Sequence, residues 1–283
     1  MNADWILHNK LYRSITLYVN YVNKSPLRIG AGKGRSLTSV VDLAVLRINI
    51  NGKELPYIPG SSLKGVFRST TENIARSYNI SNVCYGGEEG SQREFRNELD
   101  GAIKNNDIER IKETLNKLCL CCKIFGSSSY ASHIIFSDAY VNGDFMLGVK
   151  TGIAINRRSG SVKRGALYEV EYVNPGASFN GEIILNNLPN YAIGLIAKVI
   201  DYINSGIVKI GGFKSRGFGE IECKINNISG KVNINGSIKD LSEIDKLTKL
   251  DDNDKDIVID KNNILGILDQ AKVIFDEYAS SNR

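Results

Sequence analysis

Alternating apolar and polar positions mark the extended segments of this chain. Residues 14–22 read Ser-Ile-Thr-Leu-Tyr-Val-Asn-Tyr-Val and are rich in β-branched and aromatic residues, which predicts a strand. Further strands are predicted at residues 43–50, 134–141, 178–185 and 219–225. Two more, at 152–156 and 166–173, flank the basic stretch 157–165, and this arrangement predicts a protruding hairpin.

Helical periodicity separates these strands. After Tyr57-Ile-Pro-Gly60, Ser61 is placed to N-cap a helix with one apolar face, while Lys64, Arg68 and Thr71 share a polar face. The almost wholly apolar segment 191–203 predicts a buried helix. A short helix is predicted at 107–118 and an amphipathic one near the C-terminal end of the chain.

The order strand, helix, strands, helix, strand predicts an α+β fold of the ferredoxin-like (RRM-like) βαββαβ type with large insertions. The expected units are a main body at 1–230, a lid-like insertion at 82–133 and the hairpin at 153–173. Beyond the body we expect an acidic linker at 231–260 and a C-terminal helix at 261–283.

Charge is unevenly distributed along the 283 residues. The net charge is +5, but residues 231–283 hold 8 Lys/Arg against 11 Asp/Glu, so the first 230 residues hold 28 against 20. A basic body favours an anionic partner, although a solvated surface explains such a surplus as well. The chain has neither a long apolar run nor the start of a signal peptide, so we expect no membrane contact and a cytoplasmic location.

Two glycine-rich basic stretches suggest contact with RNA. In Gly-Gly-Phe-Lys-Ser-Arg-Gly-Phe-Gly, residues 211–219, bare backbone can approach a sugar-phosphate chain while the cations and aromatic rings bind phosphates and bases. A turn before an edge strand is the alternative interpretation. The loop 28–36 is also glycine-rich, but it lacks the spacing of a nucleotide-binding phosphate loop, which argues against ATP.

The candidate RNA-binding residues combine these stretches with the helix start and the hairpin tip. Lys64 and Arg68 are included because cations in a first helical turn are unfavourable with the helix dipole unless an anion binds there. The full set is Arg28, Lys33, Arg35, Ser61, Ser62, Lys64, Arg68, Arg157, Arg158, Lys163, Arg164, Gly212, Phe213, Lys214, Ser215, Arg216 and Gly217.

Cysteine spacing suggests a metal site. Cys119 and Cys122 form a Cys-x-x-Cys pair, and Cys84 lies in a loop that could return to it, so the three are candidate ligands of a structural zinc. Free thiols and a disulfide are the alternatives. His133 opens the predicted strand at 134–141, and the sequence does not predict the direction of its side chain. With two histidines in the chain, a histidine-driven ribonuclease is disfavoured.

Four segments stand in an order and spacing typical of one family. They are 57–68 (Tyr-Ile-Pro-Gly-Ser-Ser-Leu-Lys-Gly-Val-Phe-Arg), 123–127 with 136–139, 153–160 with 165–171, and 211–219. Together, from residue 14 to about 225, they resemble the RAMP superfamily of CRISPR effector proteins, specifically the repeating backbone subunit of type III (Csm/Cmr-type) complexes. The resemblance implies a palm that binds guide RNA, a β-hairpin thumb, and copies that stack into a filament with target RNA and other effector subunits.

The resemblance also implies a catalytic residue. Catalytic members carry an Asp in a pattern like Gly-Gly-Ile-Asp-Asn-Pro-Val after the first strand, and the matching stretch here is Ser39-Val-Val-Asp-Leu-Ala-Val45. Asp42 therefore stands at the catalytic position, where a carboxylate serves a divalent cation (Mg or Mn) in RNA cleavage. Taken alone, a loop Asp is typical of a turn or cap. The alternatives are a non-cleaving structural subunit and a stand-alone RNA-processing endonuclease.

Overall fold

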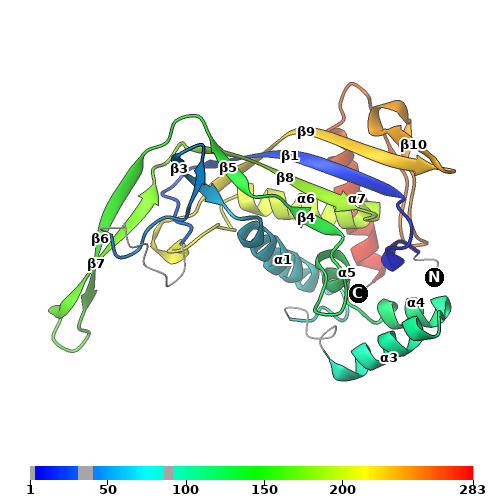
Figure 1. Ribbon diagram of the computed structural model, residues 1–283, viewed down its shortest axis with the longest axis horizontal. Coiled ribbons are helices and arrows are strands. Elements are labelled where there is room, and N and C mark those ends of the chain that lie inside the picture. The colour runs from blue at the N-terminus through cyan, green and yellow to red at the C-terminus, as the bar shows by residue number, and fades with distance from the viewer. Residues whose placement is uncertain (1–3, 31–40, 86–91, 283) are drawn as a thin grey trace.

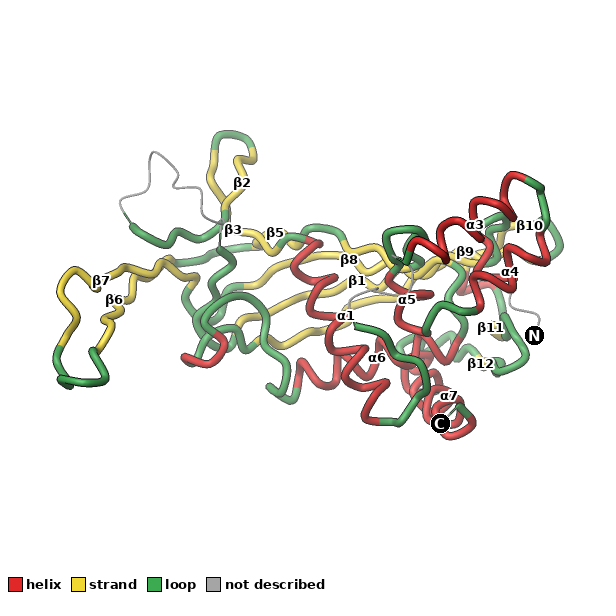
Figure 2. The backbone as a smooth tube through the Cα atoms, turned by 90° about the horizontal axis from the view of Figure 1, so that it is seen from below, coloured by secondary structure: helices red, strands yellow, loops and turns green. Residues whose placement is uncertain are grey.

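An antiparallel sheet forms the centre of the molecule, with helices on one of its faces (Figures 1 and 2). The computed structural model describes residues 4–30, 41–85 and 92–282, except the side chains of 154 and 163–166. Along the sheet the strands follow the order β10-β9-β1-β8-β5-β3-β2, and β4 pairs with β8. The strands of this sheet are β1 (Arg13–Asn23), β2 (Arg47–Ile50), β3 (Lys53–Ile58), β4 (Ile134–Phe136), β5 (Ala139–Asn142), β8 (Ser178–Asn186), β9 (Ile221–Ile234) and β10 (Ser237–Asp240).

The helices come from three parts of the chain. They are α1 (Gly60–Ser77), α3 (Arg93–Lys104), α4 (Ile108–Asn116), α5 (Leu120–Phe125), α6 (Asn190–Asn204) and α7 (Gly266–Ser281), with 3₁₀ turns η1 (Asp4–Leu7), η2 (Lys214–Arg216) and η3 (Leu241–Glu243). Helices α1 and α6 pack on the sheet and α7 packs on α6. The expected mixed α+β architecture is therefore confirmed. None of the described helices has the length and apolarity to cross a bilayer.

Alternation explains why β1 is the central strand. Its odd-numbered side chains, from Ile15 to Tyr21, are buried beneath the helices, while the even-numbered ones face the open side of the sheet. Leu17 lies opposite Ile183 of β8 and Ile228 of β9. Burial of this stripe between sheet and helices fixes the register of all three strands, because a slip by one residue would expose it.

Close packing of α6 on α7 depends on one glycine. A Cβ built on Gly194 would lie 2.0 Å from the carbonyl oxygen of Ala271, so the two helix backbones touch at this point. We expect Gly194→Ala to lower the free energy of unfolding by about 1–3 kcal/mol through overpacking. Urea unfolding measures the change.

Gly101 in α3 is the matched control for this substitution. A Cβ there meets nothing within 4 Å. Gly101→Ala should raise the free energy of unfolding by about 0.5–1 kcal/mol, because alanine restricts the unfolded helix segment without a clash. Shifts in the same direction for both variants would contradict the helix contact inferred at Gly194.

Two predicted strands are interrupted in the structure. The segment 43–50 forms β2 only from Arg47, and the segment 134–141 is divided into β4 and β5. The interruption occurs at Ser137 and Asp138, where Asp138 Oδ1 accepts a hydrogen bond from the Gly60 N–H at the start of α1. The chain leaves the sheet here because the Asp138 carboxylate binds the N-terminal end of α1.

Residues 231–260, expected as an acidic linker, fold against the body. β9 continues to Ile234, and β10, η3, β11 (Lys246–Leu247) and β12 (Ile257–Val258) follow. The Asp254 carboxylate is buried and accepts N–H groups of Asn190 and Tyr191, the first turn of α6. The buried Arg13 guanidinium donates to the carbonyl oxygens of Leu188 and Thr248. Asp254 is thus a structural partner of the body.

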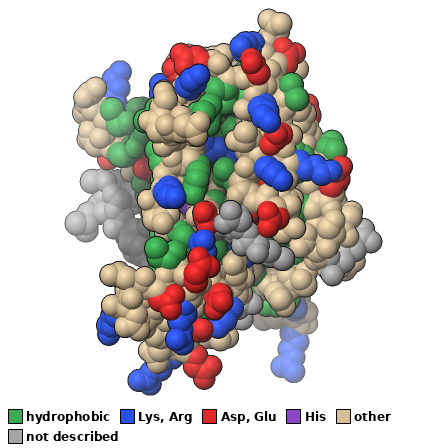
Figure 3. Space-filling model, turned by 90° about the vertical axis from the view of Figure 1, so that its right-hand side faces the viewer, with side chains coloured by type: hydrophobic (Ala, Val, Ile, Leu, Met, Phe, Trp, Pro, Cys, Tyr) green, Lys and Arg blue, Asp and Glu red, His purple; other side chains and the backbone are tan. Residues whose placement is uncertain are grey.

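Strands β6 (Leu147–Ile155) and β7 (Val162–Val173) form a separate two-stranded hairpin, here called the thumb, which projects from one end of the sheet (Figure 1). Short bridges between Leu27 and Val173 and between Leu43 and Val170 hold its base. The opposite end, with α3 and α4, carries intermixed acidic and basic side chains (Figure 3). Among the described residues of that end, cations therefore do not dominate the surface.

Candidate functional site

The start of α1 is built from two of the motifs that the sequence singled out. Besides the hydrogen bond to Asp138, Gly60 approaches β4 so closely that a Cβ would lie 2.3 Å from the Phe136 carbonyl oxygen. Pro59 occupies the N-cap position, so the expected N-cap role of Ser61 is wrong, and Ser61 lies exposed in the first turn. The Ser61 side chain at the start of α1 therefore lies at the surface.

The loop 211–219 is fastened to the segment after β1. The Gly212 N–H donates to the Arg28 carbonyl oxygen at 2.8 Å, and the Gly219 N–H donates to the Pro26 carbonyl oxygen at 3.0 Å. Gly211 has φ +92° and a Cβ there would lie 2.5 Å from the Arg28 oxygen. Glycine is required at this position, since no other residue tolerates both the dihedral angle and the approach.

A surface hollow of about 370 Å³ forms where these pieces meet. Its walls come from three distant segments, and most of its lining residues are glycine or serine: Ile29, Gly30, Ser61, Ser62, Gly65, Val66, Ser69, Gly211, Gly212 and Lys214. Ser61, Ser62, Gly212 and Lys214 were expected in an RNA-binding site, and they are brought together here. Walls without bulky side chains let the sugar-phosphate backbone of an RNA approach the protein backbone closely.

The sequence interpretation missed Gly65 and Ser69 as part of this wall. Both lie on α1 one and two turns after Ser61, so small residues recur every four positions along one side of the helix. That spacing is visible in the sequence. Lys64 and Arg68, which carry the charge typical of a phosphate site, lie on an adjacent face of the helix.

Arg68 makes several contacts within the protein. Its guanidinium pairs with Glu72, donates to the Gly126 carbonyl oxygen at 2.8 Å and contacts the Cys122 sulfur at 3.4 Å. These contacts tie α1 to the cysteine-bearing segment. Lys64 is half-buried, and burial together with the nearby Arg68 lowers its pKa.

Arg28 and Arg216 both lie close to the ring of Phe213. The Arg28 guanidinium carbon is 5.5 Å and that of Arg216 is 5.2 Å from the Phe213 ring centroid. Burial lowers the pKa of Arg28, whereas Lys214, Ser215, Arg216 and Gly217 are exposed. Cations and a ring therefore border the hollow.

The thumb carries the remaining candidates. Arg157 and Arg158 are exposed at its tip, where the Arg158 N–H donates to the Asn156 side-chain oxygen. The side chains of Lys163 and Arg164, and residues Lys33 and Arg35, lie outside the described residues. Apolar side chains on one side of β6 and on Leu167 of β7 are exposed, Ile155 by 61% and Leu167 by 64%.

Asp42 lies at the base of the thumb. Its Oδ2 accepts the Glu169 N–H at 3.1 Å, and Leu43 exchanges backbone hydrogen bonds with Glu169 and Glu171 of β7. The Asp42 side chain is exposed. Its carboxylate thus makes a contact of the capping type and still offers oxygen to solvent.

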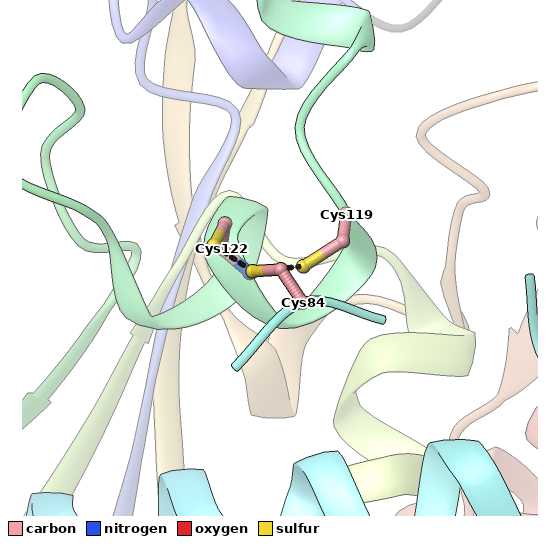
Figure 4. Close-up of side chains that lie close together, drawn as sticks. All are labelled: Cys84, Cys119 and Cys122. Carbon is pink, nitrogen blue, oxygen red and sulfur yellow. Dashed lines mark hydrogen bonds between the residues drawn. The ribbon is translucent and has the colours of Figure 1, made fainter. Parts of the chain in front are cut away.

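The three candidate metal ligands come together (Figure 4). Cys84 Sγ lies 3.3 Å from Cys119 Sγ and 3.2 Å from Cys122 Sγ, and all three residues are buried. Cys119 is the N-cap of α5 and its sulfur accepts the Cys122 N–H. Hydrogen bonds from Cys121 and Cys122 lower the pKa of Cys119.

The three sulfurs supply part of the donor set of a structural zinc site. Such a site is tetrahedral with four ligands, and its sulfurs stand about 3.8 Å apart, so a small outward shift of the three cysteines would accommodate the ion. Among the described residues, no fourth Cys, His, Asp or Glu joins the group. The five cysteines form no disulfide.

His133 belongs to a different cluster. It is fully buried, stacks on His8 with ring centroids 3.8 Å apart, and lies 2.7 Å from the Tyr130 hydroxyl. Burial lowers its pKa to about 3, so the ring is neutral at physiological pH. Its role is one of packing around Trp5 and the first residues of the chain.

Comparison with known proteins identifies the family. The model of the RAMP superfamily matches residues 22–222, which run from the end of β1 to the start of β9 and include the hollow, the thumb and the cysteine cluster. A search of curated proteins finds no match. RAMP proteins generally bind RNA and other CRISPR subunits. The chain therefore belongs to the RAMP superfamily, whose members have CRISPR-associated RNA-binding roles.

Proposed function

We propose that this chain is a guide-RNA-binding backbone subunit of a type III (Csm/Cmr-type) CRISPR ribonucleoprotein. The observation that carries the proposal is the hollow, where Gly30, the Ser61–Ser69 side of α1 and the loop 211–219 converge beside exposed cations. Its walls offer backbone and hydroxyl groups together with Lys214, a combination that binds phosphate and sugar without reading bases. Such contacts suit a guide whose sequence changes.

Cleavage of paired target RNA is the activity that we propose for Asp42. The exposed Asp42 carboxylate would hold a divalent cation, Mg or Mn, which supplies charge stabilisation for attack on the phosphate when bound. The backbone bond from Glu169 orients this carboxylate at the base of the thumb. Because one carboxylate is a partial ligand set, activity is expected in the assembled complex with guide and target RNA.

The wider assembly is part of the same proposal. Copies of the ferredoxin-like palm would stack into a filament along the guide, with other effector subunits at its ends, in the cytoplasm. The exposed apolar side of the thumb supports this arrangement, because an isolated two-stranded hairpin is marginally stable in water. Zinc at Cys84, Cys119 and Cys122 would fix the insertion to the body.

RNA binding by the purified full-length chain tests the proposal. We expect micromolar or tighter binding to single-stranded RNA of any sequence. Lys214→Gln combined with Arg216→Gln should weaken binding and reduce the slope of log K against log salt by about 0.7 for each phosphate contact removed. Fluorescence anisotropy at several salt concentrations measures both effects.

Lys239→Gln is the matched control, since Lys239 is exposed in β10 outside the hollow. Its salt slope should equal that of the unaltered protein. Two results would argue against a backbone groove at the loop 211–219. One is sequence-selective binding, and the other is an equal loss of RNA affinity in the Lys214→Gln, Arg216→Gln double variant and in the Lys239→Gln control.

A further inference from the structure

The segment 41–46, which carries Asp42, is not itself part of a helix or strand. It is attached to β7 by an isolated bridge between Leu43 and Val170. A carboxylate that serves in catalysis must be held within about 0.5 Å of its productive position, and irregular backbone does not provide this by itself. Contacts from neighbouring elements therefore decide where Asp42 lies.

The Glu171 carboxylate of β7 binds this segment directly. Its Oε2 accepts the Val45 N–H at 2.9 Å, and its Oε1 accepts a hydrogen bond from the Arg47 guanidinium at the start of β2. The Glu171 side chain is buried. One side chain of the thumb therefore holds both the backbone that follows Asp42 and the first residue of the next strand.

Three hydrogen bonds from two positions of β7 act on neighbouring residues of the segment. The Glu169 N–H donates to Asp42 Oδ2 at 3.1 Å, and the Glu171 N–H donates to the Leu43 carbonyl oxygen at 3.0 Å. The bond from Val45 to the Glu171 side chain is the third. Because the first two leave the end of the segment unfixed, the third completes its attachment to the thumb.

Arg47 explains why position 171 carries a carboxylate. The Arg47 side chain is 28% exposed, and its other acidic neighbour, Glu54, lies 3.6 Å away and is 63% exposed. A neutral group at position 171 would leave this half-buried cation with only a weak, solvated partner. An amide there would also turn its NH₂ group toward one of the two donors that Glu171 accepts.

We propose that Glu171 is a positioning residue for the cleavage proposed for Asp42. Its carboxylate fixes the segment 41–46 against β7 and so sets the place of the Asp42 carboxylate relative to the RNA phosphate. Both Glu171 oxygens are engaged within the protein and buried, so its role is to place Asp42 and not to hold the cation. This inference rests on the proposed cleavage and adds a second residue to it.

Glu171→Gln in the assembled complex tests the positioning role. We expect the single-turnover rate of target cutting to fall about ten- to one-hundred-fold, as a small displacement of a reacting group causes. The Mg or Mn concentration that gives half-maximal cutting should rise. Affinity for guide and target RNA should stay unchanged, because Glu171 does not line the hollow.

Amide hydrogen exchange provides a readout that does not depend on cutting. In the full-length chain, Glu171→Gln should speed exchange at residues 41–47 by about ten- to one-hundred-fold, as the loss of a hydrogen bond to a charged group does. Mass spectrometry of the peptides covering these residues measures the change. Unaltered exchange would overturn the attachment inferred for Glu171.

Glu54→Gln is the matched control, because Glu54 contacts the same Arg47 guanidinium from an exposed position on β3. Its cutting rate and its exchange should equal those of the unaltered protein. Arg47→Met combined with Glu171→Gln removes the cation that the amide leaves unpaired and lets the glutamine oxygen accept the Val45 N–H. This double variant should recover most of the cutting that Glu171→Gln loses.

The outcomes separate the positioning role from the proposed cleavage. If Asp42→Asn stops cutting but Glu171→Gln cuts at the unaltered rate and with the unaltered metal dependence, the positioning role is overturned while the cleavage stands. Loss of RNA affinity in parallel with cutting, or no recovery in the double variant, would also overturn it. Unaltered cutting by Asp42→Asn would overturn both.

Discussion

Asp42→Asn is expected to stop cleavage of target RNA by the assembled complex while leaving binding of guide and target unchanged. Asparagine keeps an oxygen that accepts the Glu169 N–H, so the loop at the base of the thumb should retain its structure. It removes the charge that a divalent cation requires. We expect a loss of about 10²- to 10⁴-fold in the rate of cutting, measured on labelled target RNA under single-turnover conditions.

Asp144→Asn serves as the control, since Asp144 is an exposed carboxylate in the turn before β6. Its cutting rate should equal that of the unaltered complex. Cutting that survives in Asp42→Asn would favour the non-cleaving role for this chain, with the nuclease elsewhere in the complex. Metal-independent cutting of repeat RNA by the isolated chain would favour a stand-alone processing endonuclease.

Loss of metal from the cysteine cluster is the second change for which we expect a large effect. The purified protein should contain about one zinc per chain, and Cys119→Ser should remove it, because one of the three sulfur ligands is lost. The loop at Cys84 and the start of α5 are joined at this cluster. Without the ion, we expect the melting temperature to fall by about 4 °C or more.

Cys223→Ala separates metal loss from loss of packing. Cys223 is buried in β9, and burial raises the pKa of its thiol, so this residue is not expected to bind metal. The variant should be less stable yet keep its zinc, as measured by elemental analysis. A protein that lacks zinc throughout, with all five thiols reactive after unfolding, would restore the interpretation as free cysteines.

Periodicity was sufficient to predict much of the core. The strand at 14–22 and the helix at 191–203 lie within β1 and α6, because burial against a sheet imposes a pattern that needs no distant partner to be recognised. The break at Asp138 was not predictable in this way. Its cause is the Gly60 amide, 78 residues away, which the local sequence does not reveal.

Charged residues were the least predictable part. Arg68 was expected to face phosphate, and Asp254 was expected in a linker, yet both make specific internal contacts. Composition records the charge of such residues but not the group that neutralises it. The glycine loop of the hollow was predicted from the sequence, but its wall on α1 was missed. Gly65 and Ser69 contribute to that wall because their side chains are small.

The contacts of Arg13 have a consequence for the order in which the protein is completed on the ribosome. The Thr248 carbonyl that Arg13 binds is synthesised 235 residues after Arg13 itself. A nascent chain therefore holds this buried cation without its complete set of acceptors until residue 248 has been made. Products truncated before residue 248 lack this acceptor, so we expect them to be captured by chaperones or degraded.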